Sequence, residues 1–218
     1  MSPIADTLSL HTLRDRAGLT RSDRCDFFTE WQNLDQPLTE ANLALVDRLT
    51  RRYRYYFDEA LMQEEAIKMT LISPILETVG FYDPPFYTDF ERSIRLDLSA
   101  PEDPDQSMIY RGRIDTLVIL ETLWILTIES KNMRLSVENG LAQLLAYMLE
   151  SPNRDRATFG LLANGTDFLF VKLDHGADQS WNYALSRKFS MQTDGDLGDV
   201  LRILDRLKVL ALDSIQES

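Results

Sequence analysis

The spacing of hydrophobic residues changes along the chain, and each spacing predicts a different element. Over residues 59–79 apolar side chains recur every three to four positions, which predicts a helix with one buried face. Ser73 and Pro74 either kink this helix or restart it, and Gly80 is expected to end it. The expected apolar face consists of Leu61, Ile67, Leu71, Ile75 and Leu76.

Helical spacing also appears nearer the N-terminus. Residues 23–34 predict a short helix whose aromatic side chains join the core, and Pro37, Thr39 and Glu40 indicate where a longer helix begins. The aromatic side chains are those of Phe27, Phe28 and Trp31, and the longer helix would bury Leu43, Val46, Leu49, Tyr53 and Phe57. We therefore expect residues 1–58 to form an N-terminal helical extension and residues 59–218 to form the main domain.

Beyond residue 85 the alternating spacing that is typical of strands dominates. The expected elements are a strand within 86–98, a polar loop over 99–108, strands over 110–120 and 123–131, a helix that begins near Ser136, strands at 157–163, 167–173 and 183–191, and a closing helix over 197–211. Asn164 and Gly165 predict a tight turn between two of the later strands. This order predicts an α+β fold with a mixed sheet flanked by helices.

Charged groups interrupt the most hydrophobic part of the chain. Asp115 lies early in the first of the two central strands, and Glu129 and Lys131 end the second. Burying such charges is costly unless they are paired or bind a metal ion. Two carboxylates that converge near a lysine can bind a hard divalent cation through oxygen, while the lysine positions a water molecule or stabilises negative charge.

The register of the two central strands decides whether these carboxylates converge. A two-residue turn at Glu121 and Thr122 would pair Asp115 with Ile128 and place the two acids on opposite faces. A three-residue connection or a bulge would pair Asp115 with Glu129 instead. We expect this odd register, because a shared metal ion requires it.

These residues resemble those of a known family. Asp115 followed by Glu129-Ser130-Lys131 resembles the D…(D/E)-x-K signature of the PD-(D/E)XK nuclease superfamily. The segments 64–81, 143–147, 159–165 and 168–172 resemble parts of the N-terminal nuclease domain of type I restriction enzyme R subunits. The resemblance covers roughly residues 59–174, and it implies a restriction-endonuclease-like sheet with an αβββαβ core.

The resemblance also implies which residues would act. The catalytic residues would be Asp115, Glu129, Lys131 and Gln143. Asp115 and Glu129 would bind Mg²⁺ or Mn²⁺, with Glu64 or Glu65 as a further ligand. These two glutamates lie about 100° apart around a helix, so at most one of them points into the site. Nucleic acid would contact Arg111, Arg113, Arg134 and Tyr147.

Composition narrows the class of protein. The chain has 218 residues, of which 44% are hydrophobic, which is enough for a substantial core. No apolar run approaches about 18 residues, and the segment from Met1 to Asp15 lacks the pattern of a secretory signal, so we expect a soluble cytoplasmic protein with no membrane span. A single cysteine, Cys25, excludes an internal disulfide and a cysteine-based zinc site.

The overall charge argues against a simple nucleic-acid-binding protein. The net charge is −12, from 35 acidic and 23 basic residues, whereas nucleic acid favours a basic surface. Basic residues nevertheless gather in two places, at Arg48, Arg51, Arg52 and Arg54 and around the motif at Arg111, Arg113, Lys131 and Arg134. The first group is expected either to form a solvated helix face or to contact a DNA backbone.

Three hypotheses on function follow. The first is a metal-dependent DNA endonuclease in restriction or defence. It would act as a homodimer or with a separate motor or specificity subunit. Any dependence on ATP would come from such a subunit, because the chain has no phosphate-binding loop of its own. The second is a catalytically inactive module of the same fold that binds nucleic acid or assembles a complex. The third is an unrelated α+β protein in which Asp115, Glu129 and Lys131 do not converge.

Overall fold

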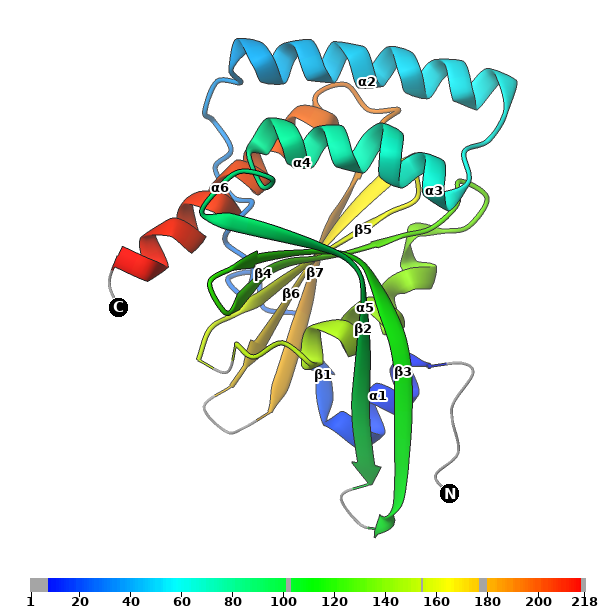
Figure 1. Ribbon diagram of the computed structural model, residues 1–218, viewed down its shortest axis with the longest axis vertical. Helices are drawn as coiled ribbons and strands as arrows, with labels where there is room; N and C mark the ends of the chain where they lie inside the picture. Colours follow the sequence, from blue (N-terminus) through cyan, green and yellow to red (C-terminus); the bar gives the residue numbers. More distant parts are fainter. Residues whose placement is uncertain (1–7, 101–102, 154, 177–179, 217–218) are drawn as a thin grey trace.

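A mixed β-sheet runs through the molecule, with helices packed on both of its faces (Figure 1). The computed structural model describes residues 8–100, 103–153, 155–176 and 180–216. In these residues the sheet has seven strands in the order β1-β7-β6-β5-β4-β3-β2. The strands are β1 (Leu19–Arg21), β2 (Phe86–Ala100), β3 (Asp103–Leu120), β4 (Leu123–Ser130), β5 (Thr158–Ala163), β6 (Asp167–His175) and β7 (Trp181–Ser190).

The order of the elements agrees with the expected core. The helices are α1 (Leu10–Ala17), α2 (Glu40–Glu59), α3 (Glu64–Ile67), α4 (Ser73–Val79), α5 (Leu141–Leu149) and α6 (Asp196–Gln216). Helix α4 precedes β2, β3 and β4, and α5 precedes β5, so the prediction of an α+β fold with a mixed sheet flanked by helices is confirmed. The pairs β4–β5 and β1–β7 are parallel, and the other neighbours are antiparallel. No helix in the described part of the chain is both long and apolar enough to cross a membrane.

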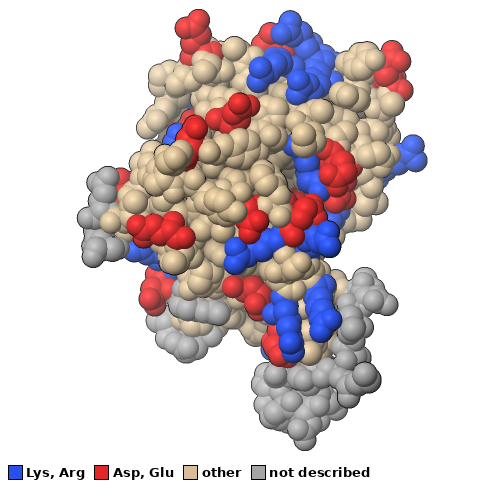
Figure 2. All heavy atoms as spheres, viewed as in Figure 1, with Lys and Arg blue, Asp and Glu red and all other residues tan. Residues whose placement is uncertain are grey.

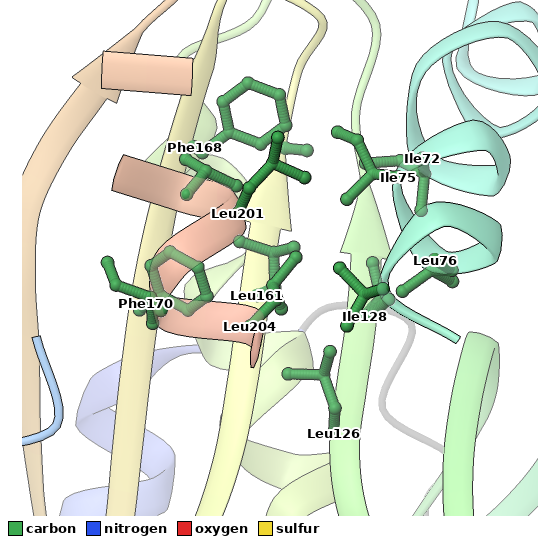
Figure 3. Close-up of a cluster of buried hydrophobic side chains, with 14 of the residues drawn as sticks. Ile72, Ile75, Leu76, Leu126, Ile128, Leu161, Phe168, Phe170, Leu201 and Leu204 are labelled. Atoms are coloured by element: carbon green, nitrogen blue, oxygen red, sulfur yellow. The ribbon is translucent and has the colours of Figure 1, made fainter. Parts of the chain in front are cut away.

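Two hydrophobic layers hold the helices to the sheet. On one face α4 and α6 pack against the central strands, α2 packs on these two helices, and Figure 3 shows the middle of this layer. Its labelled side chains are Ile72, Ile75 and Leu76 from the helical segment over residues 64–79, Leu201 and Leu204 from α6, and Leu126, Ile128, Leu161, Phe168 and Phe170 from the strands. On the other face α1 and α5 contribute to a second layer. The candidate site lies on β3 and β4, at the end of their pairing far from the hairpin turn.

The N-terminal helix predictions are only partly confirmed. Residues 23–34 contain turns rather than a helix, although Phe28 is buried and its aromatic neighbours pack on the core as expected. Helix α2 begins as predicted, with Thr39 as its N-cap. Its predicted buried face is partly confirmed: Leu49 and Tyr53 are buried and Val46 is partly buried, but Leu43 and Phe57 are exposed. The buried side chains are Asn42, Leu45, Leu49 and Tyr53, because α2 turns this face toward α4 and α6.

The helix expected over residues 59–79 begins later and contains an irregular turn. It starts at Glu64, and a π-helical turn spans Lys68–Ile72 before α4. The N–H of Ser73 donates to the carbonyl of Lys68, five residues back, and Ser73 keeps helical dihedral angles. Ser73 is therefore not an N-cap, and the π turn carries the helix through Pro74, which has no N–H to donate. Gly80 ends the helix in the left-handed conformation, as predicted.

The polar loop expected over residues 99–108 is wrong. Strands β2 and β3 continue into it, and Ala100 pairs with Asp103. Antiparallel pairing across so long a hairpin satisfies the backbone polar groups that a loop would leave to water. Asp115 therefore lies late in β3 rather than early in a strand.

The C-terminal half follows the sequence pattern closely. Strands β5, β6 and β7 and helix α6 lie within a few residues of their expected positions. Gly165 has a positive φ of 86°, and the side chain of Asn164 accepts hydrogen bonds from the N–H groups of Thr166 and Asp167, which fixes the tight turn. Strand β1 was not predicted, because it is only three residues long.

Candidate active site

The β3–β4 hairpin determines how the two acids meet. Its turn is the two-residue one at Glu121 and Thr122, since Leu120 pairs with Leu123. The expected three-residue connection is therefore wrong. Ile125, however, is an extra residue in β4, and the register shifts by one beyond it.

The shift brings the two acids into register. Beyond the bulge Thr116 pairs with Ile128, so Asp115 and Glu129 occupy the next opposed positions. The N–H of Ser130 donates to Asp115 Oδ2 at 2.7 Å, which ties the first acid to the second strand. The expected odd register is thus confirmed, and a bulge produces it.

Asp115 is held by two donors. Its side chain is almost fully buried, and its Oδ1 lies 3.4 Å from Lys68 Nζ. Burial raises the pKa of Asp115, and the Ser130 N–H and the lysines oppose that rise without cancelling it. An ionised carboxylate at this buried position therefore attracts a further cation strongly.

Glu129 is the most unusual group in the structure. It is 1% exposed, its Oε1 accepts a hydrogen bond from Lys131 Nζ, and its Oε2 is buried without any hydrogen-bond partner. Burial, and then the charge of Asp115, raise the pKa of Glu129 to about 8. A buried carboxylate oxygen with no partner among the described residues is costly, so a cation bound at this position would be stabilising.

A chain of hydrogen bonds extends from Lys131 into the helix layer. Lys131 Nζ lies 3.2 Å from Gln143 Oε1, and Gln143 Nε2 donates to the hydroxyl of Tyr147. That hydroxyl also accepts the N–H of Arg113 at 3.2 Å. Tyr147 is 1% exposed, so its side chain is not accessible to nucleic acid in this structure. It holds Gln143 in place instead.

The structure distinguishes the two glutamates at the start of α3. Glu64 is half-buried, and its burial raises its pKa. The nearby charge of Lys131 lowers this pKa, and the nearby charge of Asp115 raises it. Glu65 is 80% exposed and forms an ion pair with Lys68 at 2.9 Å. Glu64 is therefore the glutamate that faces the acids, and Glu65 points outward.

Two residues of the site were missed in the sequence. Lys68 Nζ lies between Glu65, Glu91 and Asp115, at 2.9, 3.1 and 3.4 Å. Burial alone lowers the pKa of Lys68, but its acidic partners outweigh that effect and raise it. Glu91 adopts a positive φ of 54°, which is uncommon outside glycine. The signal for Lys68 was its position one turn after Glu64, whereas nothing in the sequence marks Glu91.

The remaining basic residues lie on the surface. Arg111, Arg113 and Arg134 are all exposed, and Arg113 approaches Glu91 at 3.4 Å. On α2, Arg51 pairs with Asp47 at 3.0 Å, while Arg52 donates to the carbonyl of Thr70 in the π turn. Arg52 therefore joins α2 to the next helical segment and is not part of a free basic face.

The donor set is compatible with a metal ion that is bound by few protein ligands. Within the described ranges, no three His, Cys, Asp or Glu side chains are arranged to hold a metal ion by themselves. Asp115 and Glu129 nevertheless supply paired carboxylates, and the unpartnered Glu129 Oε2 is an available oxygen ligand. Mg²⁺ is commonly held by one or two carboxylates and several waters, so this pair fits such an ion.

Comparisons with known proteins give little beyond this geometry. No protein-family model matches the chain, and no curated protein matches it. Among solved structures, it is similar to a fragment of a putative HsdR subunit of a type I restriction enzyme from Vibrio vulnificus YJ016, with 16% identity and a TM-score of 0.39. The similarity covers 68% of this chain and 26% of that one, so the present chain spans about a quarter of that fragment. The function is therefore argued from the site itself.

Proposed function

We propose that this chain is a metal-dependent DNA endonuclease of the PD-(D/E)XK type, with a restriction-endonuclease-like fold. The observation that carries the proposal is the paired site of Asp115 and Glu129, in which one oxygen of Glu129 is buried without a partner beside a lysine. Two acids and a lysine in this order, brought together by a strand bulge, form a donor set that can hold a divalent cation and assist hydrolysis of a phosphodiester.

Mg²⁺ or Mn²⁺ suits the oxygen ligands that the two carboxylates offer. Asp115, Glu129 and the Ser130 carbonyl would hold the ion, with Glu64 reaching it directly or through water. When bound, such an ion polarises the scissile phosphate and offsets charge in the transition state. Binding would also supply the missing partner of Glu129 Oε2 and favour the ionised carboxyl.

The other residues have distinct roles in this proposal. Lys131 holds the attacking water or stabilises developing negative charge, once its bond to Glu129 loosens. Gln143 and Tyr147 are positioning residues, because their hydrogen bonds orient Lys131 from the helix side. Lys68 balances the charge of Asp115 and Glu91.

A cleavage assay with matched variants tests the proposal. Supercoiled plasmid, linear duplex and single-stranded DNA are incubated with Mg²⁺, Mn²⁺ or EDTA. We expect metal-dependent cutting that Glu129→Gln and Lys131→Met each reduce by at least about a hundredfold.

The chain offers its own control for this assay. Glu30 and Lys172 form a second buried pair, with an N–O distance of 2.7 Å, and Glu30 Oε2 is also buried without a partner. Glu30→Gln and Lys172→Met make the same chemical changes as the two site variants at a pair that is also largely buried, and we expect both to retain cutting. Cutting that survives Glu129→Gln, or that Glu30→Gln removes equally, would contradict the assignment.

One set of contacts favours the inactive module as a second candidate. Both acids already contact a lysine, Asp115 through Lys68 and Glu129 through Lys131, so ionic partners partly replace a metal ion. Titration with Mn²⁺ separates the two candidates. A module without activity would bind no Mn²⁺ that depends on Glu129, and it would cut none of the three DNA substrates. Partners such as a second copy or a motor subunit would then supply its function.

A further inference from the structure

Strands β2 and β3 form an arm that extends beyond the rest of the sheet (Figure 1). They pair with each other from Phe86 and Leu120 as far as Ala100 and Asp103. Strand β4 pairs with β3 only from Thr116 onward. Among the described residues, the arm therefore consists of two strands without a further strand beside them, and it begins at the acidic site.

The two faces of the arm differ in character. One face is apolar and packs toward α1 and α5; its buried side chains include Ile94, Leu96 and Tyr110. The other face is exposed, and its residues include Ser93, Arg95, Arg111 and Arg113. Arg95 is paired in register with Arg111, and Ser93 with Arg113.

The opposed arginines are the feature that calls for an explanation. Like charges at directly opposite positions destabilise a strand pair, because their side chains lie side by side. The nearest acid to Arg95 is Asp97, at the limiting distance of 4.0 Å, and Arg111 forms no ion pair among the described residues. Figure 2 shows basic side chains side by side on the arm. An anion that both guanidinium groups could bind would turn this repulsion into a favourable contact.

The basic face leads directly to the carboxylates. Toward the body, Arg113 lies 3.4 Å from Glu91, and Lys68 contacts both Glu91 and the buried Asp115, at 3.1 and 3.4 Å. Four residues separate Arg111 from Asp115, which is about 13 Å along a strand and equals about four base pairs of duplex. A backbone lying along this face would therefore meet the arginines a few base pairs away from the site.

We infer that the exposed face of the β2–β3 arm binds the sugar–phosphate backbone of duplex DNA beside the bond to be cut, through Arg95, Arg111 and Arg113. This inference rests on the proposed function, because it concerns how the same site receives its substrate. Arginine is suited to the role, since its planar fork binds phosphate oxygens in pairs. On a chain with a net charge of −12, a local basic face is also what would overcome the general repulsion of DNA.

DNA binding without cleavage tests the inference separately. Binding of a fluorescein-labelled 20-base-pair duplex is followed by anisotropy in EDTA, at two or more salt concentrations. We expect Arg95→Ala with Arg111→Ala to weaken binding about tenfold at low salt. We also expect the slope of log Kd against log salt concentration to fall by about two, one unit for each lost phosphate contact.

A matched control is available at the opposite edge of the sheet. Arg21 on β1 is 59% exposed, as is Arg95, so Arg21→Ala removes an equally exposed arginine and should leave Kd and slope unchanged. Thermal melts should show no loss of stability in the double variant, because the opposed charges repel one another. Unchanged binding by the folded double variant, or no duplex binding by the native chain, would overturn the inference. Cutting that still depends on Glu129 would then leave the proposed function standing.

Discussion

At the scale of single residues, the surroundings of Glu129 set it apart from every other acid described in the chain. Glu30 also has a lysine partner and a buried oxygen without a partner among the described residues, but Glu129 is more deeply buried and faces a second carboxylate across the hairpin. The second acid repels a charge on Glu129, and burial adds to the cost of that charge. A site arranged in this way holds a proton in the absence of a cation.

The raised pKa of Glu129 predicts an unusual dependence of stability on pH. Below its ordinary value of 4.5 the carboxyl is protonated in both the folded and the unfolded chain. As the pH rises toward about 8, the unfolded chain ionises first, so the folded state loses stability over this window and not above it. We expect the free energy of unfolding in EDTA to fall by on the order of 3 kcal/mol between pH 5 and pH 8.

Glu129→Gln isolates this contribution. Glutamine keeps the size of the side chain but cannot ionise, so urea unfolding of the variant should show a smaller fall across the same window. Asp115 and Glu64 also have pKa values raised by burial, and they account for the part of the fall that remains. A variant that is less stable than the native chain at pH 8, with an unchanged fall, would show that Glu129 is ionised in the folded state.

At the scale of elements, the sequence predicted strands better than it predicted their pairing. Alternation located β4 to β7, and helical spacing located α6, because long buried stretches repeat their pattern many times. The position of the bulge at Ile125 could not be predicted from the sequence, because an apolar residue there is compatible with either face of the sheet. The π turn at Lys68–Ile72 was hidden for a similar reason: a helix with one inserted residue keeps nearly the same spacing. Both irregularities place site residues.

A short 3₁₀ turn precedes α5, and its glycine, Gly140, lies close to the site. In the turn Val137–Gly140, a Cβ on Gly140 would lie 2.8 Å from Leu162 Cδ2, 3.3 Å from Glu129 Cγ and 3.4 Å from Lys131 Cε. We expect Gly140→Ala to lower stability by about 1–3 kcal/mol and to lower cleavage by more than the loss of folded protein explains, because it displaces Lys131. Thermal melts and cleavage rates measured on the same preparations separate the two effects.

Gly198 supplies the comparison for this substitution. It lies in α6, and an added Cβ would meet the side chain of Leu38 at 2.9 Å, away from the site. Gly198→Ala gains helix propensity in partial compensation, so it should change stability little and cleavage not at all. Equal losses of cleavage in the two variants would show that Gly140 has no special role.

At the scale of the whole molecule, the N-terminal residues belong to both core layers. Leu13 and Leu19 are buried in the layer that includes α5, while Leu45, Leu49 and Tyr53 are buried in the layer that includes α4 and α6. Strand β1 also pairs with β7 at one edge of the sheet. The sequence could not reveal these contacts, because the pattern within residues 1–58 reports which face is apolar but not what covers it.

Substitutions on α2 test how far the fold depends on this segment. Leu49 is fully buried against the core, whereas Leu43 on the same helix is 56% exposed. We expect Leu49→Ala to cost about 2–5 kcal/mol of unfolding free energy and Leu43→Ala to cost almost nothing, in urea titrations of the full chain. A chain reduced to residues 59–218 should then show no cooperative unfolding transition, because it would expose the surfaces that Leu13, Leu49 and Tyr53 cover. A cooperative transition in that fragment, with Leu49→Ala as mild as Leu43→Ala, would instead establish residues 1–58 as a separate extension.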